Sequence, residues 1–190
     1  MNYINTVTLS GLLHHVSRKK EHKYFPFSVR HENLWTDGTM RKDFLNARAF
    51  PEDVQAKLSS MPENTPICVK GVLRSSKGSG ELYLAVLEVE ELAGRATLIN
   101  TVNISGYVHV IKAQAEGETG TGKYTRFAVR QENTDTDGHM RKDFLVVRVY
   151  DEGLREVLAG KNDNDPVNVE GTLRSSRGSG VNYVRCTKIE

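Results

Sequence analysis

Two segments of the chain carry residue types suited to hold a planar, charged ligand: RKDFLNARAF from Arg41 and RKDFLVVRVY from Arg141. If each segment is a strand, its side chains alternate between two faces, and one face receives two aromatic rings and an arginine. These outward sets are Phe44, Arg48 and Phe50, and then Phe144, Arg148 and Tyr150. Flat rings stack on nucleic-acid bases, and a guanidinium group binds phosphate or stacks in turn. Alternatively, the rings form a second core layer under a loop, or an interface between subunits.

Further aromatic and basic residues recur nearby and extend this candidate surface. The preceding strand places outward Tyr24 and Arg30 in the first half, and Tyr124, Arg126 and Arg130 in the second. Tyr83 and Tyr183 supply a possible further ring, and Trp35, the only tryptophan, either stacks a base in one half or contacts another subunit. Basic residues at equivalent positions predict one basic surface per half: Arg41, Lys42, Arg48, Arg74 and Lys77, and then Arg141, Lys142, Arg148, Arg174 and Arg177.

The glycine-rich segments LRSSKGSG and LRSSRGSG form a third part of the candidate surface. Each offers hydroxyl groups, backbone amides and two basic side chains, which suit contact with a phosphodiester backbone without reading of the bases. The alternative is a simple hairpin turn, because Gly-Ser-Gly would produce one in any case.

These features occur twice because the chain contains one unit twice. TDGTMRKDFL at 36–45 recurs as TDGHMRKDFL at 136–145, so equivalent positions are 100 residues apart. Near the start of each copy the spacing is 95 residues, because INTVTLSG from Ile4 recurs as INTVNISG from Ile99. Five residues are therefore inserted between Gly106 and Lys123. Solenoid repeats have periods up to about 50 residues, so a small domain has been duplicated whole. We predict one domain at 1–93 and a second at 94–190.

Each half reads as five short strands with one helical stretch. The predicted strands are 4–13, 24–31, 43–50, 66–74 and 82–90, and then 99–110, 124–131, 143–150, 166–174 and 181–189. PEDVQAKLSS and DEGLREVLAG have apolar residues one helical turn apart, and Asp-Gly at 37–38 and 137–138 closes a hairpin. The order β-β-β-α-β-β is that of the OB-fold. We therefore predict an all-β chain of two tandem OB-folds, five-stranded Greek-key barrels with one short helix between their third and fourth strands.

Composition excludes several classes of protein. The chain has 190 residues, 38% of them hydrophobic, and contains no run of about 18 apolar residues that would span a membrane. The start, MNYINTVTLSG, lacks the pattern of a signal peptide. Cys68 and Cys186 have neither CxxC spacing nor repeated partners, so two buried, reduced thiols are expected.

We expect no enzyme, metal site or cofactor. GETGTGKY at 117–124 resembles part of a phosphate-binding loop, but Tyr124 replaces the magnesium-binding Ser or Thr and a strand follows in place of a helix. His14 and His15 are adjacent and point to opposite sides of a strand, although His14 recurs as His109. Asp43 and Asp143 repeat without a second repeated acid nearby.

INTVTLSG and INTVNISG, an F-x-V strand, the two RKDFL segments, and V-K-G-V-L-R with V-E-G-T-L-R together resemble the bacterial single-stranded DNA-binding proteins. Their relatives among primosomal replication-restart proteins share the pattern. The resemblance covers nearly the whole chain, twice. It implies that Phe44 and Phe144 are the first stacking ring of the third strand, and Phe50 and Tyr150 the second.

The resemblance implies sequence-independent binding and protection of single-stranded DNA in replication, recombination or repair. Alternatives are an OB-fold adaptor or mobile-element accessory protein acting through protein partners, and an RNA-binding protein. The chain ends at TKIE with the fifth strand, so we expect no acidic tail that recruits repair enzymes. Two barrels per chain imply a homodimer with four barrels. We expect a cytoplasmic protein of bacterial, phage or plasmid origin.

Overall fold

The computed structural model describes residues 3–17, 22–34, 37–94, 98–109, 124–134 and 138–190. The first half of this described part contains β1 (Asn5–His15), β2 (Phe25–Leu34), β3 (Met40–Ala49), α1 (Glu52–Ser60), β4 (Pro66–Ser75) and β5 (Leu82–Glu91). The second half contains β6 (Asn100–His109), β7 (Thr125–Thr134), β8 (Met140–Val149), α2 (Glu152–Ala159), β9 (Pro166–Ser175) and β10 (Asn182–Ile189). The predicted order β-β-β-α-β-β is therefore confirmed in both halves.

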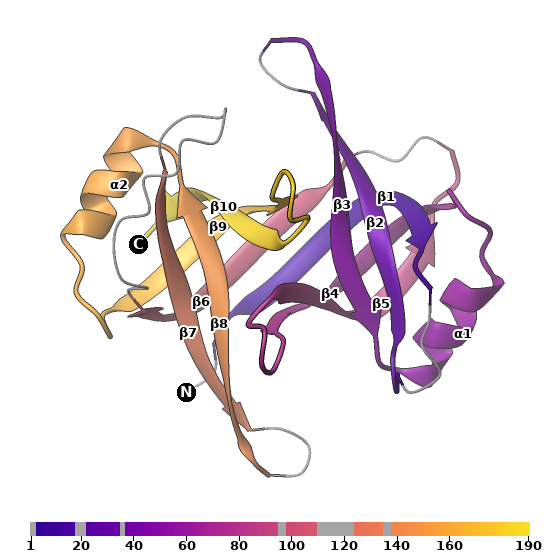
Figure 1. Ribbon diagram of the computed structural model, residues 1–190, viewed down its shortest axis with the longest axis horizontal. Coiled ribbons are helices and arrows are strands. Elements are labelled where there is room, and N and C mark those ends of the chain that lie inside the picture. Colours follow the sequence, from indigo (N-terminus) through magenta and orange to yellow (C-terminus); the bar gives the residue numbers. More distant parts are fainter. Residues whose placement is uncertain (1–2, 18–21, 35–36, 95–97, 110–123, 135–137) are drawn as a thin grey trace.

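Each half closes into a five-stranded OB-fold barrel. In the first, the strand order is β2-β3-β5-β4-β1, and a β1–β2 pairing closes the ring. In the second, the order β6-β7-β8-β10-β9 is closed by β6–β9. Figure 1 shows the two barrels side by side, with α1 and α2 at opposite outer ends.

The two barrels share one continuous sheet. β1 pairs antiparallel with β6, from Asn5 opposite Ile104 to Leu9 opposite Asn100, and β5 meets β10 where Leu82 lies opposite Asn182. The barrels are therefore joined by backbone pairing as well as by the chain. The boundary between residues 93 and 94 lies between β5 and β6, and remains a prediction.

The period-two pattern of β3 sorts its side chains as the sequence predicts. Leu45, Ala47 and Ala49 are almost completely buried, as are Leu145, Val147 and Val149 in β8. Burying one leucine side chain contributes about 1.5–3 kcal/mol, so this face fixes which side of the strand is available to a ligand. A slip of one residue would turn the whole core face outward.

The long β-hairpins are the main departure in element length. β2 ends at Leu34 and β3 begins at Met40, whereas the predicted strands stopped at residue 31 and started at residue 43. The β2–β3 and β7–β8 hairpins extend from the molecule in opposite directions (Figure 1). Gly38 and Gly138 in their turns have φ values of +80° and +81°, which favour glycine. The predicted hairpin turns are thus confirmed at these glycines.

The glycine of the V-x-G-x-L-R motif has a packing role. A Cβ placed on Gly71 or Gly171 would lie closer than 3.0 Å to the backbone carbonyl of residue 85 or 185 on the neighbouring strand. The β4–β5 register also shifts between Lys70 and Gly71, as at a β-bulge. Glycine is needed here because two backbones approach closely.

The cysteines are both free, but their surroundings differ. Cys186 is buried, and this burial raises the pKa of its thiol to about 11. Cys68 is only part-buried, because alternation along β4 puts it on the opposite face from Ile67 and Val69. The prediction of two buried thiols is therefore wrong for Cys68. Within the described ranges, no helix is long and apolar enough to cross a membrane.

Candidate nucleic-acid interface

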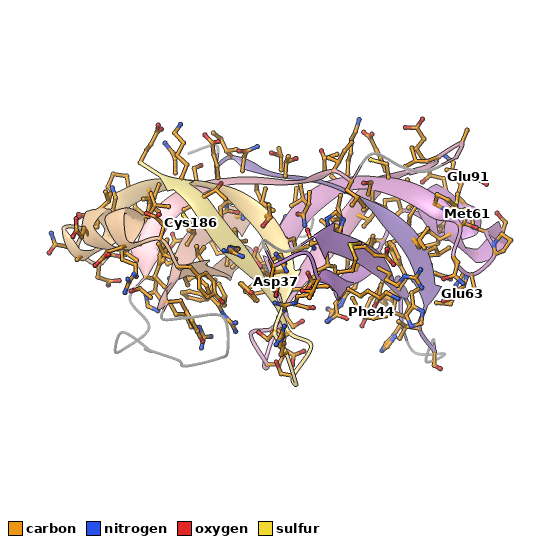
Figure 2. The ribbon with its side chains drawn as sticks, turned by 90° about the horizontal axis from the view of Figure 1, so that it is seen from above. Asp37, Phe44, Met61, Glu63, Glu91 and Cys186 are labelled. Carbon is orange, nitrogen blue, oxygen red and sulfur yellow. The ribbon has the colours of Figure 1, made fainter. Side chains whose placement is uncertain are left out.

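The outer face of β3 presents the predicted rings to solvent. Phe44 is 43% exposed and Phe50, just after the strand, is 44% exposed, with the half-buried Arg48 between them. In the second barrel, Phe144, Arg148 and Tyr150 occupy the equivalent positions and are each half-buried. Figure 2 shows Phe44 on the side of the molecule toward which the β4–β5 and β9–β10 hairpins project. The predicted direction of these side chains is confirmed, and their binding role remains a prediction.

Other predicted rings lie beneath this surface instead of on it. Tyr83 is 5% exposed and Tyr183 is 4% exposed, and Tyr124 is 8% exposed. The Tyr124 and Tyr150 ring centroids are 5.2 Å apart, and in the first barrel Phe50 lies 6.4 Å from Tyr83. The expectation that these three tyrosines are open to a ligand is therefore wrong. Phe50 and Arg48 lie against Tyr83 in the first barrel, and Arg148 lies over Tyr124 and Tyr183 in the second. The three tyrosines support the exposed rings.

Arg48 and Arg148 are held in fixed positions by these buried tyrosines. The Arg48 guanidinium carbon lies 3.9 Å from the Tyr83 ring centroid, and Arg148 lies 3.9 Å from that of Tyr183. Arg48 also donates to the Ser76 hydroxyl at 2.9 Å, and Arg148 to that of Ser176 at 2.5 Å. Each guanidinium is thus oriented before a ligand arrives, which lowers the entropy lost on binding.

The glycine-rich segments are compact hairpin turns. The Gly80 amide donates to the Ser76 carbonyl, and the Gly180 amide to that of Ser176, both at 2.9 Å. The segments therefore have the geometry of a hairpin turn, and their contact with a phosphodiester backbone remains a prediction. Lys77 and Arg177 are exposed at the tips. Both hairpins lie in the middle of the molecule between the barrels (Figure 1).

Arg174, predicted to contact nucleic acid, is instead part of a buried ion pair between the barrels. It is 6% exposed and its Nε donates to the Asp43 carboxylate of the other barrel at 2.8 Å. Asp43 is fully buried and also accepts from the Ser175 hydroxyl at 2.9 Å and lies 3.4 Å from Arg41. A buried carboxylate requires such partners, so this arginine belongs to the barrel junction.

The same arrangement occurs on the other side of the molecule. Asp143 is fully buried and accepts from Arg74 at 2.8 Å, from the Ser75 amide at 2.9 Å and from Arg141 at 3.2 Å. The Arg141 pKa is raised: burial, the largest single effect, would lower it, but the charges and hydrogen bonds of Asp143 and Tyr83 together outweigh burial. The prediction that Arg174 binds phosphate is corrected on this geometry, because its guanidinium is buried against a carboxylate. Arg74 and Arg141 also pair with a buried carboxylate, but their side chains are 29% and 22% exposed, and phosphate binding by them remains a prediction.

A pair of histidines missed by the sequence reasoning lies beside the first stacking ring. The His14 ring centroid is 5.2 Å from that of Phe44, and His109 is 4.9 Å from Phe144. His14 Nδ1 is 2.6 Å from a Glu63 oxygen, and His109 lies 3.5 Å from Asp163. The recurrence of histidine, with an acid repeated 100 residues later, was the available signal.

The remaining predicted residues are distributed around this face. Arg30 donates a hydrogen bond to the Asn64 side chain at 3.4 Å, and Arg130 donates to the Asn164 side chain at 2.8 Å. Tyr24, half-buried, lies 5.4 Å from the Phe50 ring. Lys42, Lys142 and Arg126 are exposed, and Lys142 lies 3.4 Å from Glu132. Trp35 and residues 117–123 of the glycine-rich insertion lie outside the described residues.

The described residues contain no group of three or more His, Cys, Asp or Glu side chains that could hold a metal ion. The exposed rings of this face can stack on planar groups, and its arginines can neutralise anionic charge. In the first barrel the exposed Phe44 and Phe50 lie on either side of Arg48, and in the second barrel the half-buried Phe144 and Tyr150 lie on either side of Arg148.

Comparison with known proteins identifies the fold. No family model matches the chain, and a search of curated protein sequences finds no match. Among solved structures, the single-stranded DNA-binding protein from Thermus aquaticus matches with a TM-score of 0.74 and 19% identity, over 100% of this chain and 93% of that one. A deletion variant of that protein matches with a TM-score of 0.72 and 18% identity, over 99% and 94% of the two chains. The chain therefore shares a two-barrel OB architecture with these structures.

Proposed function

We propose that this protein binds single-stranded DNA with little sequence preference, by stacking bases on Phe44, Phe50, Phe144 and Tyr150. The observation that carries the proposal is the outer face of β3, where two rings are 43% and 44% exposed beside a fixed arginine. Neighbouring exposed apolar side chains with charged residues around them are a feature of binding surfaces, and the equivalent rings Phe144 and Tyr150 are partly exposed on the second barrel. Every base has a flat face, so stacking does not depend on sequence.

The charges on this face suit a phosphate backbone. Arg48 and Arg148 are each held by a tyrosine ring and a serine hydroxyl. Further cations are exposed on β3, β7, β8 and the glycine-rich hairpins. These exposed cations are Lys42, Lys77, Lys142, Arg126 and Arg177. Such residues release condensed counterions when they contact phosphate, so affinity falls as salt rises. The likeness to a protein that is described as binding single-stranded DNA supports the same ligand here.

The proposal extends to biological role and assembly. A sequence-independent binder of this kind would protect single strands during replication, recombination or repair in the cytoplasm, without enzymatic activity of its own. Four barrels in a homodimer would give a longer track for the strand. Because each barrel is closed by hydrogen bonds, we propose that the dimer forms through side chains or loops more than through free strand edges.

The test is a fluorescence anisotropy titration of oligo-dT, oligo-rU and duplex DNA of equal length at several salt concentrations. Stacking requires unpaired bases, so oligo-dT should bind more tightly than duplex. The logarithm of its affinity should fall with log salt at about 0.7 per phosphate neutralised. Equal affinity for duplex would refute stacking, and preference for rU would change the ligand to RNA.

A further inference from the structure

A small pocket of about 180 Å³ lies where the two barrels meet. One side is formed by Arg41 of β3, in the first barrel. The other is formed by the second barrel, through Arg148, Tyr150, Ser176, Arg177, Ser179 and Tyr183. Three guanidinium groups and two hydroxymethyl groups therefore surround a volume that is too small for a drug-sized ligand.

The pocket is cationic, because the described residues that line it include three arginines and no carboxylate. The acid next to it, Asp43, lies between Arg174 at 2.8 Å and Arg41 at 3.4 Å. Two guanidinium groups share this one carboxylate, so it cannot neutralise the pocket as a whole. Burial raises the pKa of Tyr183 to about 12, so its phenol stays neutral near pH 7 and does not repel an anion.

The donors around the pocket are held rigidly. Arg148 lies over the Tyr183 ring at 3.9 Å and donates to the Ser176 hydroxyl, while its buried Nε has no hydrogen-bond partner among the described residues. These contacts orient the Arg148 guanidinium, which lines the pocket, before an anion arrives. Ser176 and Ser179 sit on a hairpin fixed by its own backbone hydrogen bond.

We propose that this pocket binds one phosphate group of a nucleic-acid backbone, with Arg148 and Arg177 as its principal donors. A guanidinium group offers paired N–H donors that match two phosphate oxygens. The proposal rests on the proposed function, since it names the phosphodiester as the ligand of one part of that surface. It gives the strand a fixed point between the barrels.

The equivalent positions of the first barrel predict a weaker site there. Phe50 lacks the hydroxyl group of Tyr150, and Lys77 has a single ammonium group in place of the Arg177 fork. Ala85 stands where the second barrel has Arg185, whose guanidinium lies 5.0 Å from the Tyr150 ring centroid. The second barrel should therefore hold a phosphate more tightly than the first.

The first experiment uses the whole unmodified protein and inorganic phosphate. Backbone amide resonances of residues 176–179 should shift saturably with phosphate up to about 50 mM, relative to chloride at equal ionic strength. Residues 76–79, the matched hairpin, should shift less. Absence of saturation, or equal shifts in both hairpins, would mean general surface charge and would overturn the proposal.

The second experiment compares charge with geometry at Arg177. Arg177→Lys keeps the charge, so it should leave the salt slope of oligo-dT binding unchanged while lowering affinity about three- to ten-fold. Arg177→Gln should also reduce the slope by about 0.7. Arg155→Gln on α2, at the outer end of the molecule, removes the same charge as a control and should change neither. Full affinity in Arg177→Lys would refute the paired-donor geometry.

These two experiments separate the pocket from the proposed function. If the unmodified protein fails to bind oligo-dT yet phosphate shifts residues 176–179, the pocket stands and the proposed function fails. If oligo-dT binds but phosphate has no effect, the pocket alone is wrong.

Discussion

Replacing Asp43 with alanine removes a carboxylate that joins the two barrels. Asp43 is fully buried, and its oxygens accept from Arg174 at 2.8 Å and from the Ser175 hydroxyl at 2.9 Å. The substitution removes the carboxylate that faces the Arg174 guanidinium, whose side chain is only 7% exposed. Removing one partner of a buried ion pair costs about 3–5 kcal/mol, because the other charge stays desolvated. For a chain of this size, about 2–4 °C per kcal/mol predicts a melting temperature lower by roughly 6–20 °C.

The assay is thermal unfolding followed by circular dichroism, with a matched carboxylate as control. Glu156→Ala removes an exposed acid from α2 and should change stability by less than about 0.5 kcal/mol. Combining Asp43→Ala with Arg174→Leu should recover part of the loss, since the buried guanidinium charge is removed together with the carboxylate. If Asp43→Ala has the same melting temperature as Glu156→Ala, the ion pair does not hold the barrels together, and this account of the junction is wrong.

Three other outcomes follow from the same structure. Leu45→Ala should cost about 2–5 kcal/mol in urea unfolding, because it empties a fully buried site, while the folded fraction keeps its oligo-dT affinity; a change in affinity without a change in stability would contradict the assigned face. Cys186 should resist iodoacetamide at pH 8 until denaturant is added, since its raised pKa of about 11 keeps it a thiol; rapid native labelling would show that it is accessible. Light scattering should give the mass of two chains at micromolar concentration, and a monomer would count against the four-barrel assembly.

The local pattern of the sequence was sufficient for the strands and their faces. Alternation along RKDFL identified Leu45 as core and Phe44 as exposed, because a strand has only two faces and one of them was continuously apolar. The helices followed from apolar residues one turn apart, and α1 indeed buries Val54 and Leu58. The duplication strengthened each of these inferences, since both halves had to satisfy the same geometry.

Contacts between distant segments were beyond local pattern. Arg174 meets Asp43 from 131 residues away, so composition alone could not distinguish a phosphate ligand from a buried ion-pair partner. Both the acid and the arginine recur at equivalent positions, and that joint recurrence was the usable signal. Likewise, alternation places Tyr83 on the outer side of its strand but does not say that Arg48 lies over its ring at 3.9 Å.

The central claim is that the exposed rings bind bases and do not stabilise the fold. Phe44→Ala and Phe144→Ala should each weaken oligo-dT binding by roughly five- to a hundred-fold, since one stacked base contributes about 1–3 kcal/mol. Val157→Ala on α2, where the side chain is 48% exposed, removes a comparably exposed apolar group and should leave affinity unchanged. Melting temperatures of all three variants should stay close to that of the unmodified protein. Phenylalanine variants that melt early while their folded fraction binds oligo-dT normally would show that the rings belong to a core or an interface, and would contradict the account.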